Sequence, residues 1–172
     1  MRAAVYYSNS DVRVEDRPQP KVGPGELLVK VMASGICGSD VMEWYRIKKA
    51  PTVLGHEIAG FVVEAGAGPA AFRPGDWIVA THHVPCYSCD YCKDGSETVC
   101  DSLRSTNFEP GGFAELVRVP KAQVDTGTLK LPEGVSFEEG TFVEPLACVV
   151  RGQRKASMKK GWHSGHELGM SA

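Results

Sequence analysis

Four of the six cysteines lie within one short segment, and this density constrains the chain more than any other feature of its sequence. The segment 84–100 reads VPCYSCDYCKDGSETVC, with spacings of two, two and seven residues between successive cysteines. Short C-x2-C steps around tight turns let thiolates converge on a tetrahedral Zn²⁺, with each sulfur about 2.3 Å from the ion. The spacing therefore favours a closed structural zinc site, formed by Cys86, Cys89, Cys92 and Cys100.

Other uses of these four cysteines remain open on spacing alone. Two disulfides are one alternative, but neighbours this close would form small strained loops, and the N-terminus does not resemble a secretion signal. An iron–sulfur cluster also takes four thiolates, and an unmetallated loop is the remaining possibility.

Composition places the chain among globular proteins. It has 172 residues, 42% hydrophobic and 23% charged, which suits one domain with a single core. No apolar run approaches the ~20 residues needed to span a bilayer. The net charge of -2 gives no electrostatic reason to expect nucleic acid or a membrane as a partner. We therefore expect a soluble, cytoplasmic protein.

Short apolar runs separated by glycine and proline predict a chain dominated by strands. The glycines at 66 and 68 precede Pro69 rather than a helix, so we interpret them as a turn and not as a phosphate loop. A helix is expected from Ser136, where Glu139 completes a capping box, with Pro145 in the first turn. The expected strands are residues 1–7 and 12–15, which form a hairpin, then 26–33, 54–64, 77–80, 111–120 and 129–132.

A second group of potential metal ligands is scattered along the chain. Cys37 and His56 each lie in a glycine-flanked turn beside an apolar segment, Glu57 follows directly, and Glu144 lies in the late helical region. A thiolate, an imidazole and a carboxylate suit an open zinc site with a fourth position for water or substrate. The residues alone are equally compatible with a buried cysteine and an ordinary histidine.

Six motifs in order give the strongest indication of family. GICGSD, LGHEIAG, FRPGDWIV, PCYSCDYCKDGSETVC, GGFAELVRVP and VEPLAC occur at separations that resemble the zinc-dependent medium-chain alcohol dehydrogenases. The similarity is greatest to the polyol branch, which includes sorbitol and threonine dehydrogenases, and it covers about residues 1–161.

This resemblance implies a fold. The expected class is mainly β (α+β), a GroES-like antiparallel β-barrel with a structural-zinc lobe at about 84–105 and a C-terminal helix. The GroES-like catalytic domain would cover residues 1–155.

The resemblance also implies roles for particular residues. Cys37, His56 and Glu144 match catalytic-zinc ligands, and Glu57 matches a glutamate beside the metal that can approach it. Ser39 matches the hydroxyl that passes the substrate proton outward, and Asp40 matches the carboxylate that holds the ligand histidine. The structural-zinc tetrad would be Cys86, Cys89, Cys92 and Cys100.

The activity implied by the resemblance is zinc-activated oxidation of a small alcohol or polyol, with hydride transfer to NAD or NADP. Two zinc ions per chain are expected. In this family a Rossmann domain holds the dinucleotide, and no glycine fingerprint for it follows Gly161.

The end of the chain departs from the family pattern. We expect residues 156–172 to be a truncated junction and loose tail, in which His163 and His166 bind nothing, so that NAD(P) has no site and this chain alone is inactive. There are two alternatives. The cofactor domain could be supplied by a partner chain, or this chain could be a stand-alone, non-catalytic zinc-binding domain.

Two further features of the chain also matter for function and assembly. Met42 replaces a histidine that continues the proton relay in several relatives. Exposure of Phe142, Leu146 and Val149 would favour self-association.

Overall fold

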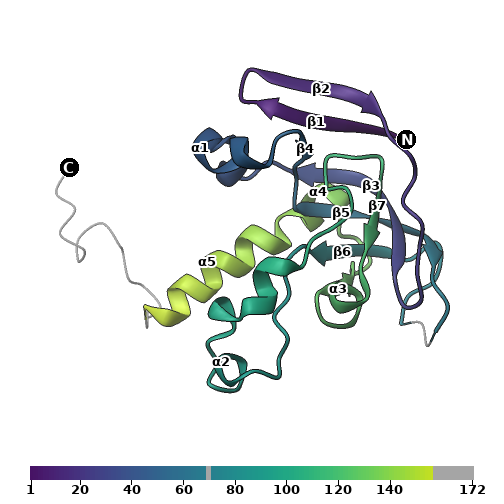
Figure 1. Ribbon diagram of the computed structural model, residues 1–172. Coiled ribbons are helices and arrows are strands. Elements are labelled where there is room, and N and C mark those ends of the chain that lie inside the picture. The colour runs from purple at the N-terminus through teal and green to yellow at the C-terminus, as the bar shows by residue number, and fades with distance from the viewer. Residues whose placement is uncertain (69–70, 157–172) are drawn as a thin grey trace.

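Two antiparallel sheets form the framework of the computed structural model, which describes residues 1–68 and 71–156. One sheet has the strand order β2-β1-β4 and the other β7-β3-β5-β6-β8 (Figure 1). The strands are β1 (Arg2–Ser8), β2 (Asp11–Asp16), β3 (Leu27–Gly35), β4 (Thr52–Val53), β5 (Glu57–Ala65), β6 (Trp77–Thr81), β7 (Leu116–Val119) and β8 (Thr128–Lys130). The mainly β (α+β) class predicted from the sequence is confirmed.

Short helices connect the strands and precede the longer C-terminal helix. The α-helices are α1 (Glu43–Arg46), α2 (Asp90–Lys93), α3 (Lys121–Thr126), α4 (Phe137–Thr141) and α5 (Val143–Lys155). The 3-10 turns are η1 (Gly38–Val41), η2 (Ile47–Lys49), η3 (Glu97–Val99) and η4 (Asp101–Ser105). In Figure 1, α5 runs from the five-stranded sheet toward the region that contains α2.

The pairing of β3 with β5 positions the later site. The two strands run antiparallel along most of their length, and Gly35 at the end of β3 lies opposite Glu57 at the start of β5. Residues on either side of this pair, far apart in sequence, are thereby brought to one edge of the sheet. A Cβ on residue 35 would lie 2.1 Å from the Glu57 carboxylate, so glycine at this position leaves the carboxylate room to lie against β3.

Alternating apolar side chains of the five-stranded sheet build the core. Val29, Ile78, Val117 and Val119 are completely buried, and Val62 is almost so. Burying a side chain of this size contributes about 1.5–3 kcal/mol, so these positions are a main source of stability.

Two strands begin later than the sequence predicts. β5 starts at residue 57 rather than 54, and β7 starts at residue 116 rather than 111. Gly55 has φ +90° and Gly111 has φ +150°, conformations outside the strand region. A Cβ at position 55 would meet the backbone nitrogen of Phe113 at 2.7 Å. The glycines thus permit a close crossing of two loop segments instead of extending the strands.

The predicted capping box is confirmed, but the helix that it starts is short. Ser136 Oγ accepts a hydrogen bond from Glu139 N at 3.1 Å, and Ser136 N donates to Glu139 Oε2 at 2.8 Å. Pro145 lies in the first turn of α5, as predicted. Because proline has no N–H to donate to the carbonyl of Thr141, the helical hydrogen-bond series is interrupted, and α4 and α5 are separate helices.

Some predicted segments fall outside the described residues. These are residues 157–172 of the expected tail 156–172, including His163 and His166, and Pro69 of the expected turn. None of the helices within residues 1–68 and 71–156 has the length and apolar character required to cross a membrane.

Candidate metal centres

The four cysteines of the segment 84–100 converge in space. Their sulfur atoms lie within 4.8 Å of one another, with Cys92 and Cys100 buried. The Sγ atoms of Cys89 and Cys92 are 3.5 Å apart, those of Cys100 and Cys86 are 3.6 Å apart, and those of Cys86 and Cys92 are 4.0 Å apart. All six cysteines are free thiols, which excludes the disulfide alternative in this structure.

These separations fit one tetrahedral ion. Four thiolates at about 2.3 Å from a central Zn²⁺ lie about 3.8 Å from one another, and the observed sulfur distances lie on both sides of this value. A multinuclear iron–sulfur cluster places several irons and sulfides between its thiolates and needs wider spacing. The donor set therefore fits a single zinc ion.

Backbone N–H groups prepare Cys86 for the thiolate form. Its sulfur accepts hydrogen bonds from Ser88 N at 3.5 Å and Cys89 N at 3.3 Å. The contacts with Ser88 are the main reason why the pKa of the Cys86 thiol is lowered to about 5, and the bond from Cys89 adds to them. Thiolates are the form that binds metals, so the turn supports the predicted ligand role.

A second group forms where β3 and β5 meet. One donor atom each from Cys37, His56 and Glu57 lies within 4.8 Å of the others. Cys37 is the N-cap of η1, where its sulfur accepts a hydrogen bond from Ser39 N at 3.4 Å. His56 and Glu57 are buried. Two ligands of one zinc ion lie at most about 4.6 Å apart, so the three side chains are placed close to the spacing that one ion requires.

Asp40 lies directly behind His56. It is 5% exposed, and its Oδ1 is 3.5 Å from His56 Nδ1. Its Oδ2 accepts a hydrogen bond from Cys37 N at 3.1 Å. Burial opposes ionisation, but the facing His56 holds the pKa of Asp40 below its usual value. In return, despite burial, Asp40 and Cys37 raise the pKa of His56 to about 9. Metal binding at this imidazole would therefore displace a proton.

Glu144 is the predicted ligand that lies apart from this group. Among the described residues, the cluster within 4.8 Å contains Cys37, His56 and Glu57 but not Glu144. Glu144 lies at the start of α5, where it accepts a hydrogen bond from Cys148 Sγ at 3.7 Å. Burial raises the pKa of Glu57, His56 opposes the shift, and the charge of Glu144 adds to it, so the two carboxylates influence each other across the cavity that both line.

Arg46 was not predicted from the sequence. Its guanidinium donates to the carbonyl oxygen and the hydroxyl of Ser39, both at 2.8 Å, and lies 3.4 Å from Asp40 Oδ1. Arg46 is in α1 and carries no recognisable motif, so no sequence signal assigned it to Ser39. It links the predicted relay hydroxyl to the carboxylate that holds His56.

A histidine pair was also missed as part of the site. The ring of His82 lies 4.6 Å from that of His56 and 3.8 Å from that of His83, between centroids. Burial is the main reason why the pKa of His82 is lowered to about 3, so this ring is neutral near neutral pH. The sequence feature that could have indicated this role is the pair of adjacent histidines, His82 and His83, directly after strand β6.

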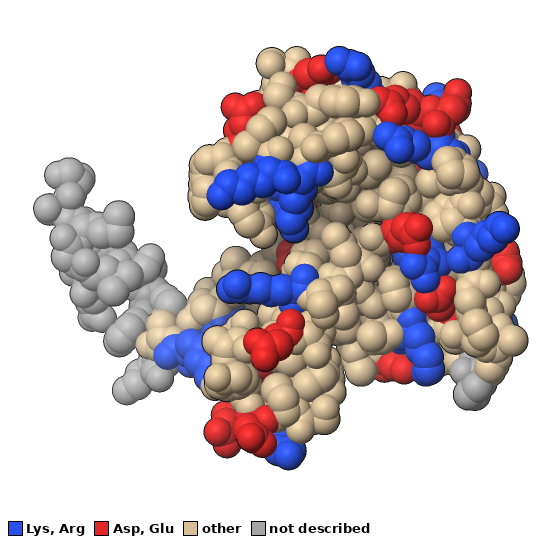
Figure 2. Space-filling view, viewed as in Figure 1, with Lys and Arg blue, Asp and Glu red and all other residues tan. Residues whose placement is uncertain are grey.

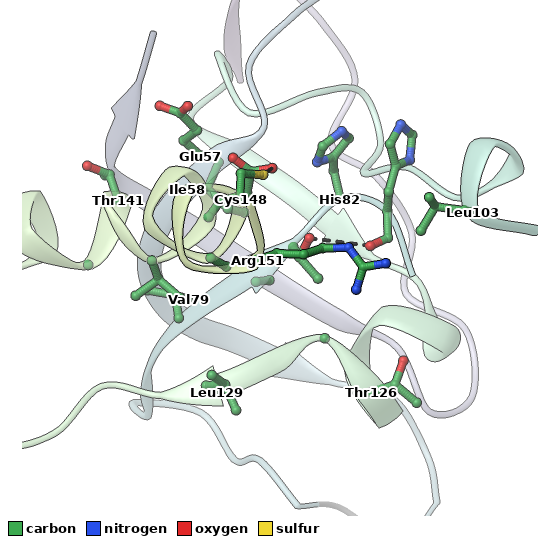
Figure 3. A pocket seen from close by; sticks show the side chains of 18 residues that line it. Glu57, Ile58, Val79, His82, Leu103, Thr126, Leu129, Thr141, Cys148 and Arg151 are labelled. Carbon is green, nitrogen blue, oxygen red and sulfur yellow. Dashed lines mark hydrogen bonds between the residues drawn. The ribbon is translucent and has the colours of Figure 1, made fainter. Parts of the chain in front are cut away.

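Two cavities meet at these side chains. A cavity of about 840 Å³ contains Cys37, Ser39 and His56 in its lining. A second cavity, of about 470 Å³, lies between β6, β8 and α5, and Figure 3 shows its apolar walls at Val79 and Leu129. Glu57, His82, Glu144 and Cys148 line both cavities.

Comparison with known proteins gives consistent results. Residues 23–133 match the family model of the alcohol dehydrogenase GroES-like domain. The chain is 34% identical over 165 residues to a sorbitol dehydrogenase of Gallus gallus, which covers 92% of this chain and 46% of that protein. It is 36% identical over 159 residues to a probable D-xylulose reductase A of Aspergillus clavatus, covering 87% of this chain and 43% of that protein.

Solved structures show the same similarity. The alcohol dehydrogenase TADH from Thermus sp. ATN1 aligns with a TM-score of 0.77 at 32% identity, over 94% of this chain and 49% of that one. The chain thus spans about half the length of the relatives that it matches.

Proposed function

This chain belongs to the alcohol dehydrogenase GroES-like domain family, and we propose that it is the catalytic domain of a zinc-dependent alcohol or polyol dehydrogenase. The observation that carries the proposal is the convergence of Cys37, His56 and Glu57 at the edge of the β3–β5 pair, beside a cavity large enough for a small polyol. Relatives named as sorbitol dehydrogenase and D-xylulose reductase favour a polyol as the substrate.

We propose two zinc ions per chain. The tetrad Cys86, Cys89, Cys92 and Cys100 would hold a structural ion, for which the sulfur spacing is suitable. Cys37 and His56 would hold the second ion together with Glu57 or Glu144, which both line the same cavity. When bound there, zinc supplies a Lewis acid that lowers the pKa of an alcohol.

The protein's own residues would orient the site and move the proton. Asp40 accepts from Cys37 N and faces His56 Nδ1, so it fixes the position of both proposed ligands. The hydroxyl of Ser39 accepts one hydrogen bond from Arg46, and its second lone pair can take the substrate proton. Neither Arg46 nor Met42 can accept a proton, so we propose that Ser39 gives its own hydroxyl hydrogen to water as it takes the substrate proton.

The remaining parts of the proposal concern partners. Hydride transfer requires a nicotinamide. We propose that NAD or NADP is bound by a domain that corresponds to the half of the relatives' length that this chain does not match.

We also propose self-association through an apolar face on α4–α5. Its exposed side chains are Phe142 (68%), Leu146 (59%) and Val149 (55%). The free thiols of the lobe favour a reducing compartment such as the cytoplasm.

Metal content tests the proposal directly. Native mass spectrometry of the full chain should show two bound zinc ions in the wild type. Each of the variants Cys37→Ser and Cys100→Ser should retain a single ion. Fusing the chain to the half of the Gallus gallus sorbitol dehydrogenase that the alignment does not cover should then produce NADH from sorbitol, and the same fusion with Cys37→Ser should not.

Two outcomes would contradict the proposal. If the Cys37→Ser chain keeps the zinc content of the wild type, the second site does not bind metal. That result would favour a non-catalytic zinc-binding domain instead. An active fusion that is insensitive to Cys37→Ser would equally exclude the proposed role of this thiolate.

A further inference from the structure

Basic side chains line the 840 Å³ cavity on two facing elements. Lys49 is the last residue of η2, and Arg104 is in η4, at the C-terminal end of the zinc lobe. Figure 2 shows Lys and Arg atoms on both sides of the hollow that opens between the α1 region and the η4 region. Positive charge therefore borders the entrance to the candidate metal centre from two directions.

These two charges have no carboxylate partner in the described part of the chain. Of the Lys and Arg residues that line the cavity, Arg46 is bound to Ser39 and Asp40. Within residues 1–68 and 71–156, no ion pair within 4.0 Å involves Lys49 or Arg104. The Nζ atom of Lys49 lies over the ring of Tyr45, 5.9 Å from its centroid.

The charge of Lys49 also acts into the cavity. Burial is the main cause of the lowered pKa of His83, and the Lys49 ammonium contributes to the same shift. His83 lines both cavities, so the ammonium is close enough to influence groups inside the cleft.

The lining of the same cavity also includes acidic side chains at the candidate metal centre. Asp40 is paired with Arg46, whereas Glu57 and Glu144, one of which we propose as the third metal ligand, line the cavity without an ion pair among the described residues. The cavity therefore has a metal-binding end that suits a hydroxyl and a basic rim that suits an anion. A ligand that matches both ends carries a hydroxyl and, some distance away, a strongly anionic group.

We propose that Lys49 and Arg104 form a subsite for a phosphoryl group, on a ligand whose other end extends toward Cys37 and His56. A guanidinium binds phosphate through two parallel hydrogen bonds and an ammonium contributes a compact charge, so one residue of each type on facing walls suits a doubly charged group. The direction of the ligand rests on the proposed function. The phosphoryl group belongs either to a phosphorylated polyol substrate or to a nicotinamide dinucleotide.

Calorimetric titration of the zinc-loaded full chain tests this subsite. The probes are D-sorbitol 6-phosphate, D-sorbitol, inorganic phosphate and NADP⁺, with Lys49→Gln and Arg104→Gln as test variants. Lys48→Gln and Arg154→Gln are matched controls, because both residues are exposed and neither lines the cavity. Neither test residue belongs to the proposed metal sites, so zinc content serves as a separate check.

We expect sorbitol 6-phosphate to bind at least about tenfold more tightly than sorbitol, because each charge-assisted contact contributes more than a neutral one. Each test variant should weaken phosphate-containing probes by roughly fivefold or more, and each control by less than about twofold, because a charge outside the cavity is screened by solvent. A response to sorbitol 6-phosphate identifies a phosphorylated substrate, and a response confined to NADP⁺ identifies the dinucleotide.

Equal affinity for sorbitol and its phosphate, together with NADP⁺ binding that is unchanged in both test variants, would overturn the proposal. Equal losses in test and control variants would also overturn it, since they would indicate only diffuse surface charge. If the Cys37 site takes no zinc while phosphate binding still depends on Lys49 and Arg104, the proposed function fails and the subsite remains.

Discussion

Arg46→Met is the most informative single perturbation of the candidate metal centre. Arg46 makes two hydrogen bonds of 2.8 Å to Ser39 and an ion pair of 3.4 Å to Asp40, and its side chain is 14% exposed. Methionine has a similar length and fills comparable space without donating a hydrogen bond. The substitution therefore removes the contacts and leaves most of the packing.

The expected loss follows from these contacts. A hydrogen bond from a charged donor contributes about 1.5–3 kcal/mol, so two such bonds contribute about 3 kcal/mol at the lower value. Water can solvate part of Ser39 after the change, because this hydroxyl is only partly buried. We expect the free energy of unfolding to fall by about 2 kcal/mol. We also expect metal affinity at Cys37 and His56 to fall by at least about tenfold, since Asp40 would be less well held.

Cobalt titration separates these two effects. With the cysteine lobe already filled by zinc, the thiolate–cobalt absorption of the Cys37 site reports affinity, and urea unfolding of the same sample reports stability. Arg46→Lys keeps the charge without the fork and should lie between wild type and Arg46→Met. Lys48→Met is the control in the same segment. An Arg46→Met protein with the cobalt affinity and stability of the Lys48→Met control would refute this reasoning.

Four further substitutions are predicted to change stability. Cys100→Ser should remove the lobe zinc and lower thermal stability by several degrees, as measured by native mass spectrometry and calorimetry, since structural zinc contributes directly to folding. Gly60→Ala should lower the free energy of unfolding in urea by about 2 kcal/mol or more, because its Cβ would lie 2.0 Å from a carbonyl oxygen of β3. Gly152→Ala in α5 should raise the same free energy by about 0.5–1 kcal/mol, because the space around this residue is open. Arg118→Met should lower the free energy of unfolding by about 1–2 kcal/mol at pH 7. Despite burial, Arg118 holds the pKa of Glu26 below the ordinary value of a glutamate. The stabilising contribution is therefore present above that ordinary value, and the difference between variant and wild type should shrink as the pH falls through the lowered pKa. A constant difference from pH 7 to pH 3 would contradict the assignment.

Local spacing in the sequence was sufficient to predict the cysteine lobe. Three of its four cysteines are separated by two residues each, so the chain has few ways to arrange their sulfurs, and the ordered motifs around them identified the family. The capping box at Ser136 and the position of Pro145 were predictable for the same reason, because each depends on neighbours within one turn. The convergence of the four thiols is the outcome of short-range geometry.

The second centre depended on contacts between distant segments. Cys37 and His56 meet because β3 and β5 pair in a register that puts Gly35 opposite Glu57, and a shift of that register would move every side chain. Arg46 reaches Ser39 and Asp40 only through the path of α1, which no periodic pattern specified. The sequence by itself determined which residue types and which family were present. The tertiary structure decided which side chains meet, because long-range register and loop paths depend on the packing of the whole core.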